Sequence, residues 1–193
     1  MKKIALMISG ILAAALLLSA CVPAPVQAET TPVPEVAAAT EAATEPDAAE
    51  ETGDALEFSL TTLTGDTLDQ TVFTENKLIM VNYWATWCGP CVSEIPDLIK
   101  ISEDYADKGF VLIGVLTGDD DIDGAKSFIA DQGVSYPVVL PEAFFLNHVD
   151  SIYAIPTTMF FNAEGEQINA AVVGAKSYED WAGLIDLLLG QVS

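Results

Sequence analysis

The 193-residue sequence contains no arginine and only seven lysines, against 29 aspartate and glutamate residues. Its net charge of −22 repels phosphate backbones, which excludes a nucleic-acid-binding function. A chain this poor in cations is also not held at anionic lipid by basic residues. We therefore attribute the acidic composition to solubility and expect no nucleic-acid partner.

Ligands for a metal are equally scarce, because the chain has three cysteines (Cys21, Cys88 and Cys91) and a single histidine, His148. A structural zinc site needs about four protein ligands, usually two cysteine pairs or cysteines with histidines at fixed spacing. The sequence therefore predicts no metal site.

A long apolar run is confined to the N-terminus, where residues 4–20 follow two lysines. The run is slightly shorter than the roughly 20 residues of a retained membrane helix, and its basic start and small-residue end are typical of a secretory signal peptide. The letters LSAC at 18–21 resemble the lipobox of bacterial lipoproteins. We predict a lipoprotein signal peptide over 1–20 and lipidation of Cys21. The alternative is an ordinary cleavage site that happens to precede a cysteine.

Residues 22–55 consist mainly of alanine, proline, threonine and glutamate, with no aromatic residue. Such a segment buries too little apolar surface to offset its ordering entropy. We predict a lipidated cysteine followed by a disordered linker over 21–55, and a folded domain over 56–193.

Within this domain, strand and helix patterns alternate. The apolar runs 77–84 and 110–116 are typical of fully buried strands, and a hairpin is expected from the strand pattern at 58–63 with its following turn. Further strands are expected at 137–140, 157–162 and 167–173, and helices at 90–108, 122–132, 142–149 and 177–189. This alternation predicts a mixed α/β sheet with helices on both faces.

The stretch WATWCGPCVSEIP at 84–96 places Cys88 and Cys91 two residues apart. A structural disulfide across so short a loop stabilises little. At the start of a helix, however, backbone N–H groups favour a thiolate on Cys88, and Cys91 lies one turn further on to resolve a mixed disulfide. Gly89 allows close approach of a partner backbone, and Pro90 suits the first helical turn. These features predict thiol–disulfide exchange.

Four motifs together resemble the thioredoxin superfamily, and within it the TlpA/ResA-like (redoxin-type) extracytoplasmic lipoproteins, over about residues 57–190. They are VNYWATWCGPC at 81–91, EIP at 94–96, IPTT at 155–158 and the turn at Gly165. The resemblance implies a thioredoxin fold, with a central mixed β-sheet flanked by helices, an N-terminal β-hairpin and a central α/β insertion.

The resemblance also implies roles for individual residues. Cys88 matches the nucleophile and Cys91 the resolving cysteine of a redox disulfide. Pro156 matches the family's cis-proline, and Ile155 before it contributes backbone hydrogen bonds to the substrate. Trp87 is expected in the docking surface together with Gly89 and Pro90. A proline that merely starts a strand is the alternative for Pro156.

Asn82 stands where cytoplasmic thioredoxin has a buried aspartate that assists proton transfer. TlpA/ResA-like proteins commonly lack that acid and have a glutamate at the position of Glu94. We therefore expect Glu94 to act as the acid/base of the site. The alternative is a first-turn helix carboxylate favoured by the helix dipole.

The expected function is that of a membrane-anchored extracytoplasmic thiol–disulfide oxidoreductase, mainly a reductant, that needs no cofactor. The resemblance implies a membrane thiol carrier as electron donor and envelope proteins as clients, such as apocytochrome c or a methionine sulfoxide reductase. A thiol oxidase or isomerase, a thiol peroxidase and a non-catalytic client-binding lipoprotein are the alternatives. Asp150 and Ser151 depart from the Tyr-Gly pattern common ahead of the proline, so the sequence does not indicate the substrate preference.

Overall fold

The computed structural model describes residues 56–192. The predicted signal peptide, the lipidation site Cys21 and the linker 21–55 lie outside the described residues. No helix in residues 56–192 has the length and apolar character needed to cross a membrane.

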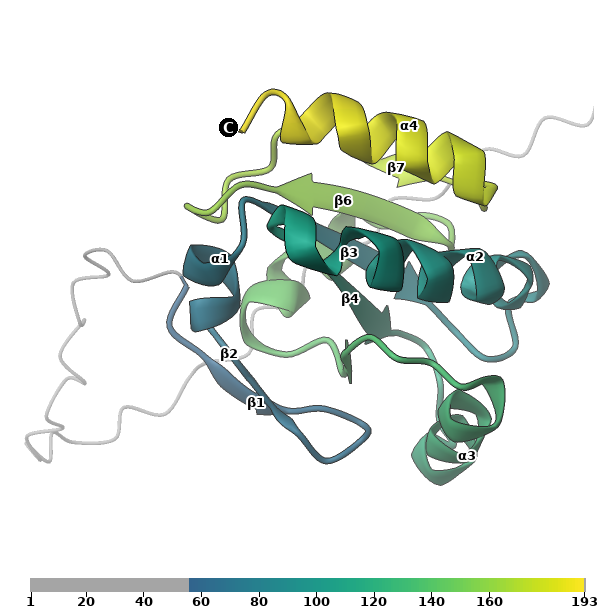
Figure 1. Ribbon diagram of the computed structural model, residues 1–193. Coiled ribbons are helices and arrows are strands. Elements are labelled where there is room, and N and C mark those ends of the chain that lie inside the picture. Colours follow the sequence, from purple (N-terminus) through teal and green to yellow (C-terminus); the bar gives the residue numbers. More distant parts are fainter. Residues whose placement is uncertain (1–55, 193) are drawn as a thin grey trace, which may run out of the picture. The chain divides into compact units, whose positions relative to one another are not determined.

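A five-stranded sheet with the strand order β5-β4-β3-β6-β7 forms the centre of the domain (Figure 1). Strands β3, β4 and β5 are parallel, whereas β6 runs antiparallel to both β3 and β7. The five strands are β3 (Leu78–Trp84), β4 (Phe110–Leu116), β5 (Val138–Val139), β6 (Thr157–Phe161) and β7 (Val172–Val173). The predicted mixed sheet is confirmed.

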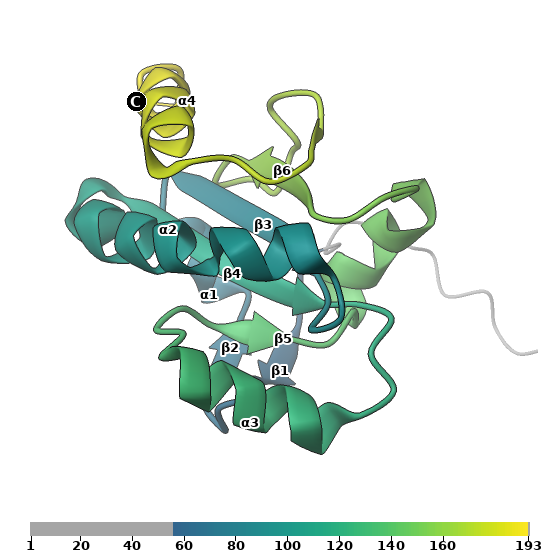
Figure 2. The same ribbon diagram turned by 90° about the vertical axis from the view of Figure 1, so that its right-hand side faces the viewer.

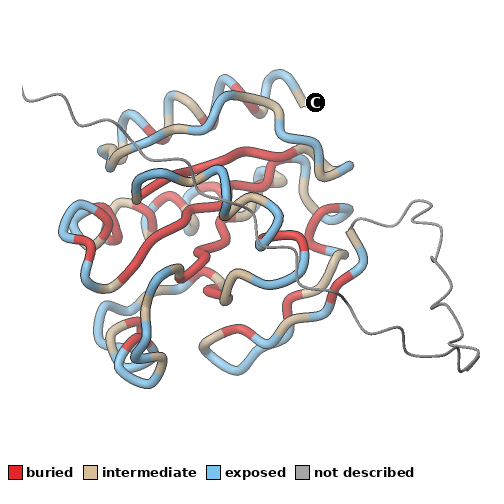
Figure 3. Tube along the Cα trace, turned by 180° about the vertical axis from the view of Figure 1, so that it is seen from behind, coloured by how far each residue is buried: buried red, intermediate tan, exposed pale blue. Residues whose placement is uncertain are grey.

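Side chains of β3 alternate between two hydrophobic cores, one on each face of the sheet. Met80 and Trp84 belong to the first core, and Ile79, Val81 and Tyr83 belong to the second. Every residue of β3 is buried, as the continuous apolar run predicts, and Figure 3 shows the central strands as the buried part of the domain.

The first face of the sheet carries α2 (Gly89–Tyr105), α3 (Ile122–Gln132) and α4 (Tyr178–Leu189), whose apolar residues belong to the first core. Helices α2 and α4 lie beside each other in both views (Figures 1 and 2). The second face carries the hairpin of β1 (Ser59–Thr61) and β2 (Thr67–Asp69), then α1 (Thr71–Glu75) and the 3₁₀ helix η2 (Ala143–Ser151). The expected N-terminal hairpin is therefore present, as is an insertion of α3 and β5 between β4 and β6.

Three elements differ from the sequence-based expectation. The five-residue helix α1 was not predicted, because its β-branched sequence TVFTE has no helical signal and its buried Val72 and Phe73 decide its conformation. The segment expected as a helix at 142–149 is a 3₁₀ helix, in which the Phe145 N–H donates to the Glu142 carbonyl three residues back.

The third difference concerns the strand expected at 167–173, of which only Val172–Val173 is regular. Gln167 forms an isolated bridge with Phe161, and an unbroken ladder from there would place Ala170 opposite Thr158. Thr158 instead faces Val172, so two extra residues loop out between the two paired regions. The prediction of one continuous strand was wrong because alternation in the sequence does not reveal this change of register.

Candidate active site

The two cysteines lie at the N-terminus of α2, where they form a disulfide with a Cα–Cα distance of 5.3 Å. Cys88 is the N-cap of α2, and its Sγ accepts a hydrogen bond from the Cys91 backbone N–H at 3.3 Å. Pro90 follows within the first turn, where its missing N–H costs nothing. The helix start thus offers its unpaired N–H groups and dipole to a negative charge on Cys88.

The two sulfurs differ in access. Cys88 is 6% exposed and lines a surface groove, whereas Cys91 is 1% exposed and does not line it. Gly89 and Pro90 between them are exposed. A partner can therefore reach Cys88 first, with Cys91 behind it, as the assignment of attacking and resolving cysteines requires.

The loop before β6 lies against the cysteine pair. The Ile155 carbonyl oxygen is 3.6 Å from Cys88 Sγ, although the two residues are 67 positions apart in the chain. The Ile155–Pro156 peptide bond is cis, as the resemblance implies, and Pro156 is buried beside the site. The sequence-predicted residues Cys88, Cys91, Ile155 and Pro156 are thus brought together.

A groove of about 580 Å³ runs past Cys88. Its lining includes Trp87, Gly118, Ile152, Tyr153 and Ile155, from three separate segments of the chain. We call this surface the client groove. Tyr153 was not singled out from the sequence, because an isolated tyrosine in a loop gives no sign of what it faces.

Trp87 is 65% exposed yet held in one position. Its indole Nε1–H donates to the Gly118 carbonyl at 2.8 Å. Next to it, Asp119 accepts two hydrogen bonds from Thr86, one from the backbone N–H at 2.8 Å and one from the hydroxyl at 2.7 Å. We call these three contacts the Thr86–Asp119 clamp.

Sequence reasoning missed this clamp, although a signal was available. The chain leaves β3 at Trp84 and leaves β4 at Leu116, and the two strands are parallel neighbours. The carboxyl ends of parallel strands meet at one edge of a sheet, so the polar residues after β4 must lie near the residues after β3.

Glu94 belongs to α2 and lies beyond its first turn, and only 2% of the residue is exposed. Its Oε1 accepts from Asn82 Nδ2 at 3.0 Å, and its Oε2 accepts from the Lys176 backbone N–H at 3.2 Å. The structure therefore contradicts the alternative of an ordinary first-turn helix carboxylate.

Burial raises the pKa of Glu94 to about 7, although the hydrogen bonds from Lys176 and Asn82 oppose the shift. Residues three apart on a helix lie on one face, so Glu94 and the buried Cys91 share the inner face of α2. A carboxyl group with a pKa near neutrality at this place has the properties of a proton donor and acceptor.

Within residues 56–192, no three or more histidine, cysteine or acidic side chains cluster in a way that could hold a metal ion. The chemistry that the described residues bring together is that of two cysteine sulfurs, a buried carboxyl group and an apolar groove.

Comparison with known proteins agrees with this geometry. The Redoxin family matches residues 46–179. The chain is 30% identical over 122 residues to the thiol-disulfide oxidoreductase ResA of Halalkalibacterium halodurans, covering 62% of this chain and 67% of that protein. It is also 30% identical over 116 residues to the protein of the same name from Oceanobacillus iheyensis, covering 58% of this chain and 57% of that protein.

Among solved structures, the chain is similar to a thiol:disulfide interchange protein of the thioredoxin family from Chlorobium tepidum. The TM-score is 0.58 with 29% sequence identity, covering 68% of this chain and 92% of that one. The thioredoxin fold expected from the sequence is thereby confirmed.

Proposed function

The chain belongs to the Redoxin family and is a thiol–disulfide oxidoreductase of the thioredoxin fold, and from this premise we propose that it reduces disulfide bonds in proteins outside the cytoplasm. The observation that carries the proposal is the arrangement of the cysteine pair. Cys88 lines the client groove at a helix N-terminus, and Cys91 lies behind it on the face shared with Glu94.

In the reducing direction, the reaction begins with both cysteines as thiols. The Cys88 thiolate attacks one sulfur of a client disulfide, which forms a mixed disulfide and releases the other client sulfur as a thiolate. Cys91 then loses its proton and attacks Cys88 Sγ, which releases the second client thiolate and leaves the Cys88–Cys91 disulfide. The client gains two electrons and two protons, and the protein loses them.

Glu94 serves the second step as the base that accepts the Cys91 proton. Its buried position and raised pKa support this role, because a base with a pKa near the working pH is partly ionised and can still hold the proton that it receives. Asn82 orients the Glu94 carboxyl group through its amide hydrogen bond at 3.0 Å.

The oxidised protein must regain two electrons after each turnover, and a membrane protein carrying a dithiol is the class of donor that can supply them. The lipobox-like letters at 18–21 support attachment to the membrane through lipid on Cys21. Such a tether keeps the domain next to a donor in the same membrane. Stable anchoring takes two acyl signals, which lipoprotein processing provides.

The clients are envelope proteins that need reduced cysteines in a compartment that oxidises them. Apocytochrome c and methionine sulfoxide reductase are two such classes, since each requires free thiols for its own chemistry.

The midpoint potential of the Cys88–Cys91 pair tests the direction of electron flow. A reductant of this superfamily is expected below about −200 mV, and a value well above that would make the protein an oxidase or isomerase instead. Equilibration with dithiol buffers of known potential measures it.

Trapping tests the roles of the two cysteines. Cys91→Ser should accumulate mixed disulfides with clients, whereas Cys88→Ser should form none. A biological activity that survives both substitutions would instead favour a non-catalytic client-binding lipoprotein. Cys21→Ser should release the protein from the membrane fraction without changing the midpoint potential.

A further inference from the structure

We propose that the client groove selects an extended segment with a bulky apolar side chain next to its cysteine and a lysine or arginine close by. This inference rests on the proposed function, because it names the kind of client that the same cysteine pair reduces.

The apolar part of the inference comes from the lining of the groove. None of its eleven residues is charged, and most of its surface is formed by aliphatic and aromatic side chains such as Trp87, Ile152 and Ile155. A leucine-sized side chain leaving water in this groove should favour binding by roughly tenfold or more.

Two aromatic side chains belong to this lining. Trp87 is fixed by its hydrogen bond to Gly118. Tyr153 is 86% exposed, and its side chain makes no hydrogen bond or ring contact within residues 56–192. A large aromatic side chain held in water beside a reactive sulfur is typical of a residue that gains its contacts only when a partner binds.

The charged part of the inference comes from the residues that directly follow two segments of the groove lining in the chain. Gly118 is followed directly by three aspartates (119–121), and Val149, which also lines the groove, is followed by Asp150. No lysine lines the groove, and the chain has no arginine. The groove lining is therefore uncharged, and acidic residues directly follow two of its segments in the chain.

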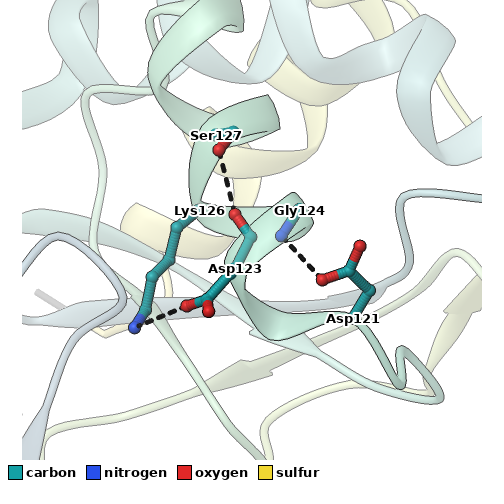
Figure 4. A network of polar contacts seen from close by, with 5 residues as sticks. All are labelled: Asp121, Asp123, Gly124, Lys126 and Ser127. Atoms are coloured by element: carbon teal, nitrogen blue, oxygen red, sulfur yellow. Dashed lines mark hydrogen bonds and ion pairs between the residues drawn. The ribbon is translucent and has the colours of Figure 1, made fainter.

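Two of these four aspartates already have partners in the domain, which leaves two for a client. Asp119 is engaged by Thr86, and Asp121 accepts from the Gly124 N–H at 2.9 Å as the N-cap of α3. Asp123 pairs with Lys126 at 3.7 Å, and both contacts are visible in Figure 4. The side chains of Asp120 and Asp150 have no hydrogen bond or ion pair in the described part of the chain, so either can meet a cation of the client.

A second copy of this chain does not fit the groove as a partner, because its net charge of −22 would be repelled by the same aspartates. Exposed ion pairs contribute little to affinity, so we expect the acidic flanks to act mainly on the rate of encounter.

Four disulfide-cyclised peptides of equal length test the proposal. Each carries leucine or serine directly before the first cysteine, and lysine or glutamate two positions further from it. The four peptides are the four combinations of these two choices. The full 193-residue protein is reduced, and the second-order rate constant for reduction of each peptide is measured in a single turnover. The leucine–lysine peptide should react about tenfold or more faster than the serine–glutamate peptide. The lysine advantage, but not the leucine advantage, should shrink as salt is raised.

Variants assign the two preferences to residues. Tyr153→Ala should remove most of the leucine preference, and Tyr153→Phe should retain it because the ring remains. Leu187→Ser is the matched control, since Leu187 is 61% exposed on α4 and does not line the groove.

Asp120→Asn should reduce the lysine preference by two- to threefold, on the order of one screened charge. Glu164→Gln should leave it unchanged, because the turn after β6 lies at the opposite end of that strand from Thr157.

The outcomes separate this inference from the proposed function. If all four peptides and a small-molecule disulfide are reduced at equal rates, the selectivity is overturned while the reductase function stands. If Tyr153→Ala and Leu187→Ser behave alike, the role of Tyr153 is overturned. If neither the peptides nor the small disulfide is reduced, the proposed function itself fails.

Discussion

Asn82 of β3 and Glu94 of α2 are joined by a buried hydrogen bond of 3.0 Å from the amide Nδ2 to the carboxyl Oε1. The same Nδ2 donates to Thr158 Oγ1 on β6, also at 3.0 Å. Three elements thus meet around one carboxyl group whose pKa burial raises to about 7. We therefore expect the stability of the domain to depend on the protonation of this carboxyl group.

The first prediction concerns stability. Between the ordinary glutamate pKa of 4.5 and the folded-state pKa of about 7, the folded protein binds a proton at Glu94 that the unfolded chain does not. The free energy of unfolding should therefore fall as pH rises through this range, by up to about 3 kcal/mol from this group. Glu94→Gln should remove that fall. Urea unfolding of the oxidised protein at pH 5 and pH 8 measures it.

The exposed Glu164 offers the matched control for this substitution, and Glu164→Gln should keep the wild-type dependence on pH. Burial lowers the pKa of His148, which adds a rise in stability with pH, but this contribution is common to all three proteins and cancels in the difference. Equal slopes for Glu94→Gln and the wild type would show that Glu94 is not the group that titrates.

The second prediction places an acid at the other end of the same hydrogen bond. Asn82→Asp would replace a donor with a second carboxyl group within hydrogen-bond distance of Glu94, and two such carboxylates cannot both ionise there. The loss in free energy of unfolding relative to the wild type should be several-fold larger at pH 8 than at pH 5, as measured by urea unfolding.

Thr158→Val is the control for Asn82→Asp, because it removes the other hydrogen bond of Asn82 without adding a charge. Its cost of about 1 kcal/mol should be nearly the same at both pH values. If Asn82→Asp shows the same small and pH-independent cost, the two side chains do not interact as the 3.0 Å distance requires.

Much of this architecture could be predicted from the sequence, because the relevant patterns are local. The apolar run at 77–84 indicates a buried strand, and Gly-Pro between two cysteines indicates a helix start. Other features depend on residues that are far apart in the chain. The hydrogen bonds of Asp119 depend on β3 and β4 being neighbours, and the loop between Gln167 and Val172 depends on the register with β6.

The burial of Glu94 lies between these two cases. Its spacing from Cys91 could be read from the sequence. Its raised pKa, however, arises from burial where α2 packs on the sheet, and the hydrogen bond from Lys176, 82 positions away, opposes this rise.

The third prediction concerns the Thr86–Asp119 clamp. Asp119→Ala should cost about 1–3 kcal/mol in stability, because it removes an acceptor of two hydrogen bonds. It should also release the neighbouring Gly118 carbonyl, so that the Trp87 indole N–H exchanges with solvent about tenfold faster or more. Hydrogen exchange of the three indole signals, followed by NMR, measures this, since Trp84 and Trp181 are buried.

Asp121→Ala is the control for the clamp, because it also removes a carboxylate bound to a backbone N–H, two residues further along. It should cost about 1 kcal/mol as a lost N-cap but leave the exchange of the Trp87 indole unchanged. Equal indole exchange in the two variants would mean that the clamp does not hold Trp87.

The last prediction uses two glycines with opposite surroundings. A methyl group at Gly114 of β4 would lie 3.1 Å from Trp84 Nε1 and 3.2 Å from Tyr136 Cε2, so these two side chains rest directly on the backbone. Both are large and buried, and they cannot move without disturbing the core above Asn82, the partner of Gly114 in β3. Gly114→Ala should therefore destabilise the domain by about 1–3 kcal/mol.

Gly183, in contrast, lies inside α4 with no heavy atom within 4 Å of where a methyl group would be placed. Gly183→Ala should stabilise the domain by about 0.5–1 kcal/mol, because alanine loses less backbone entropy than glycine in a helix. Urea unfolding of both variants under one set of conditions tests the pair. A stabilising Gly114→Ala would mean that Trp84 and Tyr136 can withdraw from the strand, and that the core over Asn82 is packed less tightly than these distances indicate.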